Sequence, residues 1–227
     1  DGADKQFVVA LDKKTGKTKW LHKRAFDYRT NNGDRKKAYS TPVVFTHKGR
    51  AQLITPAGVA TEALDPTSGK LLWTASTGGM NASGLPQYGH GLVFVNNGMG
   101  SMSAIKPDGM GDLEAVWSTR RNIPKKSSMI LHGPHLYMVA DTGVASCLDA
   151  KSGKSLWSER LDAGQFAASP LLSKGRLYFF SINGDVVVTA AETKFKVLAR
   201  SKFDDGFMAT PAVTGNALIL RTKSAVC

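Results

Sequence analysis

Short apolar runs separated by polar turns recur along the whole chain. Gly91–Val95 and Gly175–Phe180 are examples, and each is followed by a turn that contains Gly, Asn or Asp. Runs of this length, rich in β-branched and aromatic residues, are typical of strands rather than helices. No apolar run approaches the roughly 18 residues needed to cross a bilayer. The pattern predicts an all-β protein without a transmembrane segment.

One polar turn with its flanking apolar residues is repeated. Residues 63–73 read ALDPTSGKLLW, and similar stretches occupy residues 10–20 and 147–157, with weaker copies at 104–117 and 189–199. An Asp can bond the backbone of the turn ahead of it, and Gly can adopt the positive φ that other residues resist. Each copy therefore predicts a hairpin with a Trp in its second strand.

A second element recurs in phase with this hairpin. It is a small residue and Pro, an apolar run, a Gly-containing turn and another apolar run, as in residues 168–180. The four Trp residues lie 53, 44 and 40 positions apart. A period near 40 with four short strands per unit is typical of a β-propeller blade. The fold expected is an all-β propeller of four-stranded antiparallel blades.

The repeat divides the chain into one continuous propeller array, residues 1–227. Strands A and B come from the Pro-containing element, and strands C and D come from the hairpin. Residues 1–20 supply strands C and D, residues 207–221 supply strands A and B, and four full blades lie between them: 39–77, 82–119, 125–162 and 166–203. Either the two halves pair and close a five-bladed ring, or the chain is a segment of a larger ring.

These repeats resemble the pyrroloquinoline-quinone (PQQ)-type propeller repeat, and the whole chain is similar to the C-terminal portion of the outer-membrane assembly lipoprotein BamB family. The resemblance implies part of an eight-bladed ring and a periplasmic or otherwise extracytoplasmic location. It also implies a non-catalytic scaffold for protein or envelope partners. In the family the Trp docks against the turn of the neighbouring blade. Carried over, the blade-docking residues are Trp20, Trp73, Trp117 and Trp157, with Gly16, Gly69 and Gly153 as their partners.

The alternative is a quinoprotein-dehydrogenase-like enzyme or sensor, because the same repeat also carries enzymes that bind PQQ and Ca²⁺. Those enzymes characteristically have adjacent cysteines, whereas Cys147 and Cys227 are far apart. A hard cation needs several converging oxygens, and most carboxylates here fall in the repeated turns. We assign no catalytic, cofactor-binding or metal-binding residue, so PQQ and Ca²⁺ are expected only under this alternative. His132 and His135 share a turn but lack further metal ligands.

Charge is the unusual global feature, with a formal net charge of +12. Residues 21–38 and residues 119–126 each carry a net +4, and both segments join strand D of one blade to strand A of the next. Such loops open on the same face of a propeller, so a positively charged face is predicted. The alternative is that these charges only solubilise the surface. The candidate binding face consists of Arg24, Arg29, Lys36, Arg120, Arg121 and Lys125.

A partner at this face would be an acidic protein or an acidic envelope component. Nucleic acid is a weaker prediction, because the basic loops lack interleaved aromatic residues for base stacking apart from Phe26 and Tyr28. The sequence does not indicate an oligomeric state.

Overall fold

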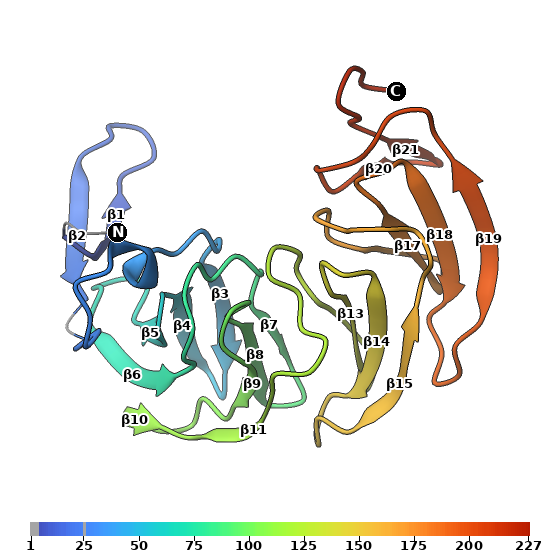
Figure 1. Ribbon diagram of the computed structural model, residues 1–227. Helices are drawn as coiled ribbons and strands as arrows, with labels where there is room; N and C mark the ends of the chain where they lie inside the picture. Colours follow the sequence, from blue (N-terminus) through green and yellow to red (C-terminus); the bar gives the residue numbers. More distant parts are fainter. Residues whose placement is uncertain (1–4, 25) are drawn as a thin grey trace. The chain divides into compact units, whose positions relative to one another are not determined.

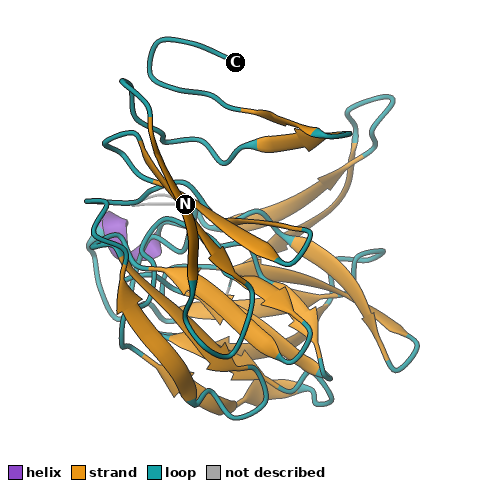
Figure 2. Cartoon of the chain, turned by 90° about the vertical axis from the view of Figure 1, so that its right-hand side faces the viewer, coloured by secondary structure: helices purple, strands orange, loops and turns teal. Residues whose placement is uncertain are grey.

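The computed structural model describes residues 5–24 and 26–227, and its chain forms two compact units, Asp1–Arg120 and Arg121–Cys227. Strands predominate in both units, and the described residues contain no α-helix, only one short 3₁₀ helix at Gly33–Lys36 (Figure 2). The predicted all-β class is confirmed.

The first unit contains three sheets. A two-stranded hairpin comes first, followed by a sheet in the order β10-β6-β5-β4-β3 and a sheet in the order β11-β9-β8-β7. Its strands are β1 (Phe7–Leu11), β2 (Thr18–Lys23), β3 (Val43–His47), β4 (Arg50–Pro56), β5 (Ala60–Leu64), β6 (Leu71–Ser76), β7 (Gln87–Gly89), β8 (Leu92–Asn96), β9 (Met102–Ile105), β10 (Gly111–Leu113) and β11 (Ala115–Thr119).

The second unit contains two four-stranded antiparallel sheets and a two-stranded hairpin. Figure 1 shows β13, β14 and β15 side by side, and β17, β18 and β19 likewise. The strands are β12 (Ile130–His132), β13 (His135–Val139), β14 (Val144–Asp149), β15 (Ser155–Arg160), β16 (Leu171–Ser173), β17 (Arg176–Phe180), β18 (Asp185–Ala190), β19 (Val197–Lys202), β20 (Ala212–Thr214) and β21 (Ala217–Ile219).

The core of each unit lies where the inner strands of successive blades face one another. In the first unit Ile54, Trp73 and Val93 come from β4, β6 and β8 and pack in one buried cluster. In the second unit, Tyr137 from β13 and Phe179 from β17 pack in another buried cluster. Inner strands are buried on both faces and are therefore continuously apolar, as in β8, whose five residues are all buried.

The strands fall inside the blade ranges expected from the repeat, with one addition. The inserted residues of the turn after β9 form β10, which pairs in parallel with β6 of the preceding blade. The first segment between blades is also shorter than expected, because residues 21–23 continue β2 and pair with β1. At the chain ends, β1–β2 and β20–β21 are separate two-stranded sheets. Closure of a ring stays one of the two alternatives.

Candidate binding surface

The turn of each Asp–Gly hairpin is held by its own carboxylate. Asp65 Oδ1 accepts hydrogen bonds from the backbone N–H groups of Thr67 and Ser68 at 2.9 and 2.8 Å, and Gly69 has φ +72°. The N–H of Ser68 contributes most to holding the pKa of Asp65 below its ordinary value. Asp12 and Asp149 make equivalent bonds within their own turns. These carboxylates are therefore committed to turn geometry.

The Trp20 and Trp157 side chains reach the turn of the next blade. The Trp20 indole donates to Pro66 O at 3.1 Å, and a Cβ built on Gly69 would lie 2.5 Å from the Trp20 ring. Trp157 donates to Glu192 O at 3.0 Å, and its ring centroid lies 5.2 Å from that of Phe195, which stands at the glycine position of the degenerate copy at residues 189–199. The two acceptors occupy the same position of the repeat.

The other predicted docking residues have different surroundings. Trp73 is 1% exposed and donates to Gln52 Oε1 at 2.7 Å, within its own blade. Trp117 is half-buried and lies near Phe94, with ring centroids 6.1 Å apart. A Cβ on Gly16 would meet nothing within 4 Å, because no blade precedes it in the described residues. Gly153 adopts φ +70° in its turn. Trp73 and Trp157 are both buried.

A polar joint lies beside Trp73, where the turn of the next blade is longer. Gln52 connects Trp73 to this turn, because its side-chain amide donates to Pro107 O at 3.0 Å. The neighbouring Asp108 carboxylate contacts the buried His47 ring, and Lys48 and Lys106 form ion pairs with it at 2.9 and 3.1 Å. His47 contributes most to holding the pKa of Asp108 well below its ordinary value. This joint fixes one blade to the next without the Trp–Gly contact.

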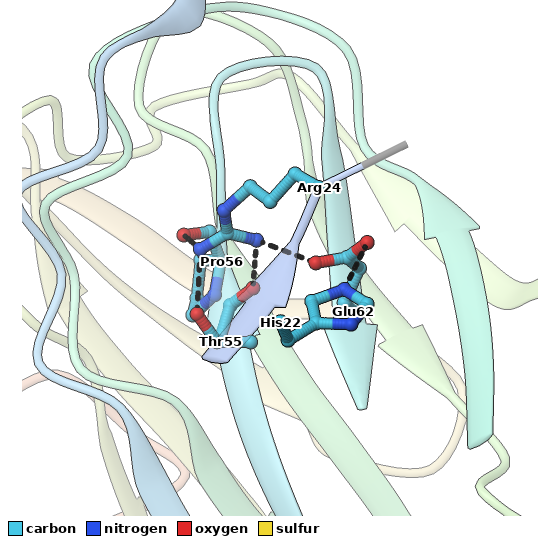
Figure 3. A network of polar contacts seen from close by, with 5 residues as sticks. All are labelled: His22, Arg24, Thr55, Pro56 and Glu62. Atoms are coloured by element: carbon cyan, nitrogen blue, oxygen red, sulfur yellow. Dashed lines mark hydrogen bonds and ion pairs between the residues drawn. The ribbon is translucent and has the colours of Figure 1, made fainter. Parts of the chain in front are cut away.

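Arg24 is not part of an exposed face, which corrects the prediction from the sequence. Its side chain is 4% exposed, its guanidinium Nη1 lies 3.0 Å from Glu62 Oε2, and Nη2 donates to Thr55 Oγ1 at 2.6 Å (Figure 3). His22 Nε2 lies 3.2 Å from the other Glu62 oxygen. Burial lowers the pKa of Arg24, and the Glu62 carboxylate opposes that shift. The pair joins β2 to the next blade, so Arg24 is structural.

The other two candidate cations of the first segment, Arg29 and Lys36, line a hollow in the loop that follows Arg24. Arg29 is exposed, and Lys36 lies with its ammonium 5.9 Å from the centroid of the Tyr28 ring. The hollow has a volume of about 550 Å³. It is lined by Gln6, Phe26, Asp27, Tyr28, Arg29, Thr30, Asn31 and Lys36. Burial raises the pKa of Tyr28, so its ring serves as a neutral wall.

The second basic segment is anchored through its backbone. The Lys125 N–H donates to Asp141 Oδ1 at 2.8 Å, and the Lys126 ammonium lies 3.4 Å from the other Asp141 oxygen. The side chains of Arg120, Arg121 and Lys125 are exposed. Arg29 and Lys36 belong to the first unit and Lys125 to the second, so a common rim for the two loops stays a prediction.

The other candidates have local roles. Cys147 is fully buried, and burial raises the pKa of its thiol to about 11, which makes it a poor nucleophile. Across residues 5–24 and 26–227, no group of three or more His, Cys, Asp or Glu residues could hold a metal ion. The same residues include no helix long and apolar enough to span a bilayer.

Comparison with known proteins identifies the fold. A family model described as outer membrane protein assembly factor BamB matches residues 111–202. No curated protein matches the sequence. Among solved structures, BamB from Moraxella catarrhalis is similar over 95% of this chain and 61% of its own, with TM-score 0.69 and 13% identity. Quinohemoprotein alcohol dehydrogenase from Comamonas testosteroni is similar over 87% of this chain and 40% of its own, with TM-score 0.60 and 16% identity.

The chain thus spans about 61% and 40% of the length of these two proteins. The strand pairing, the repeated hairpin and these likenesses agree on one architecture. This chain has the fold of a PQQ-type β-propeller and is similar to BamB.

Proposed function

We propose that this chain is a non-catalytic, extracytoplasmic scaffold that binds an acidic protein partner through the loops between its blades. The supporting observation is the match to an outer membrane protein assembly factor in residues 111–202, a range that includes exposed Arg120, Arg121 and Lys125. Cations on a rigid framework give fast, selective association with an acidic surface. The same similarity supports a periplasmic location.

The fold supports this role because the side chains of the loops are not needed to pack the blades together. Arg120, Arg121 and Lys125 contribute no side chain to the buried clusters. Their backbone is nevertheless held, since Asp141 accepts from the Lys125 N–H. Because the backbone of this loop is already ordered, it loses little further conformational freedom when the exposed side chains meet a partner. The loop is therefore suited to recognition.

The test is the affinity of the chain for a fluorescent glutamate-rich peptide at 50 and 200 mM salt. We expect binding that weakens with salt, since exposed charges are screened over about 8 Å at physiological ionic strength. Arg120→Glu with Arg121→Glu should weaken it at least tenfold. A matched control, Lys194→Glu with Lys196→Glu, changes the net charge equally in exposed residues of another turn. Equal losses in both variants would refute a role specific to this loop.

A dehydrogenase-like role is the second candidate, favoured by the likeness to the quinohemoprotein enzyme. The described residues do not offer an obvious Ca²⁺ site, since Asp12, Asp65 and Asp149 bond their own turns. Incubation with PQQ and Ca²⁺, followed by gel filtration and absorbance spectroscopy, separates the two functions. A quinone absorbance that co-elutes with the chain would favour the enzyme, whereas its absence favours the scaffold.

A further inference from the structure

In the second unit, unpaired cations gather at one edge of the two complete blades. In a four-stranded meander, the A–B turn and the C–D turn lie at the same edge of the sheet. Backbone bonds fix this arrangement in both blades, because Ala150 N–H donates to Pro134 O at 2.9 Å and Ala191 N–H donates to Gly175 O at 2.9 Å. We call this edge the hairpin-turn edge, which comprises residues 132–135, 149–155, 173–176 and 190–197.

The exposed cations of the hairpin-turn edge outnumber its acids. The six cations are Lys151, Lys154, Lys174, Arg176, Lys194 and Lys196, and the acids are Asp149 and Glu192. Asp149 is already committed to its turn. Within the described part of the chain, none of the six cationic side chains has an ion pair or hydrogen bond. Their charge is therefore available to a partner.

Several cations at the opposite edge of the same unit are committed to internal contacts, although Lys125 there is exposed. Lys126 pairs with Asp141 at 3.4 Å, and Lys202 pairs with Asp185 at 2.9 Å. Arg160 and Arg200 donate to the backbone carbonyls of residues 142 and 161. The hairpin-turn edge therefore concentrates six unpaired cations, and this gives it a positive field.

We infer that the hairpin-turn edge of the second unit binds the surface of an anionic lipid bilayer. Five of the six cations are lysines, which act as compact point charges on flexible side chains and are attracted to an anionic lipid surface. The aliphatic residues Val197 and Leu198 directly follow Lys196 and are 36% and 42% exposed. Basic residues beside exposed aliphatic ones are the combination found at membrane surfaces. This surface is separate from the loops of the proposed function.

The test is sedimentation of the full chain with vesicles of phosphatidylcholine containing 30% phosphatidylglycerol, and with pure phosphatidylcholine vesicles. We expect binding only to the anionic vesicles, weakening as salt rises. Lys194→Glu with Lys196→Glu should lower the vesicle affinity more than about 30-fold, since the two lost cations each contribute about 1 kcal/mol and the two added acids are repelled by the surface. Arg120→Glu with Arg121→Glu, of equal charge change, should have an effect at least fivefold smaller.

Three results would overturn this inference. They are equal binding to neutral vesicles, equal losses from the two variants, and tighter binding of the hairpin-turn edge to a soluble glutamate-rich peptide than to anionic vesicles. Circular dichroism of both variants checks that the sheets remain folded. Lys194→Gln with Lys196→Gln removes the charge without reversing it. This variant should also lower the affinity for anionic vesicles, but by a smaller factor than the Glu variant. Because the peptide assay and the vesicle assay use different surfaces, failure of one proposal leaves the other testable.

Discussion

Gly16 and Gly69 occupy the same position in successive hairpins and have nearly the same backbone, with φ +71° and +72°. Their neighbours differ. A Cβ on Gly69 would lie 2.5 Å from the Trp20 ring, whereas a Cβ on Gly16 would meet nothing within 4 Å. The two glycines therefore separate the conformational role of the residue from its packing role.

The first prediction uses this pair. Gly16→Ala should cost about 1–2 kcal/mol in the free energy of unfolding, the price of a left-handed conformation for a residue with a Cβ. Gly69→Ala should cost clearly more, because the Trp20 ring must also move. Urea unfolding followed by tryptophan fluorescence measures both. Equal costs would show that the Trp20 contact contributes nothing to stability.

The second prediction concerns the buried pair of Arg24 and Glu62. Glu62→Gln leaves the guanidinium buried without its counter-charge, a change that costs about 3–5 kcal/mol in comparable sites. Replacing both partners, Arg24→Met with Glu62→Leu, should restore much of that loss, because neither charge then remains buried. Thermal unfolding of the single and double variants compares them. A double variant as unstable as the single one would contradict the assignment.

The third prediction is a pH effect at Asp205. The Ser224 hydroxyl contributes most to lowering the pKa of this carboxyl to about 2, and the Ser224 N–H also donates to it, at 2.7 Å. A lowered folded pKa means that the contact stabilises the protein above about pH 4, the ordinary value, and is lost as the pH falls towards 2. The protection of the Ser224 amide, its exchange rate relative to the intrinsic rate at the same pH, should fall over that interval. In Asp205→Asn this protection should be low at both ends of the interval.

At the scale of the element, one hairpin departs from the repeat and its blade contact changes with it. The turn after β9 is longer, so Trp73 bonds Gln52 instead of a neighbouring turn, and β10 pairs with β6 in parallel. Trp73→Ala should cost about 3–5 kcal/mol, because a fully buried aromatic leaves a cavity. Trp73→Phe, which keeps most of the volume but leaves Gln52 Oε1 without its donor, should cost about 1–3 kcal/mol. Chemical denaturation gives both values.

The regular hairpins could be predicted because their signals are local. Asp65 and Gly69 determine one turn within five residues, and the same letters recur at the equivalent positions. The strand β10 could not be predicted, because its partner β6 lies about forty residues away and no local pattern marks parallel pairing. Arg24 was predicted to be exposed for a similar reason, because its partner Glu62 is distant in the sequence. A lone acid in the buried strand β5, Glu62, was the available signal that a cation must be buried nearby.

At the scale of the whole chain, the distribution of charge matters more than its total of +12. Some cations stabilise the fold, as Arg24 does through Glu62. Others are exposed in the loops between blades, such as Arg120 and Lys125, or at the hairpin-turn edge. Counting charges along the sequence could locate basic segments, but it could not separate paired from unpaired side chains, because pairing depends on contacts between blades.

Site-specific crosslinking in envelope extracts tests the proposed scaffold role most directly. A photoreactive side chain would replace Lys125 in one variant and Lys196 in the other, both exposed in the native chain. We predict that position 125 yields an adduct with an acidic protein, that the adduct disappears at high salt, and that position 196 does not yield it. The same adducts from both positions, or none from position 125 at low salt, would contradict the account.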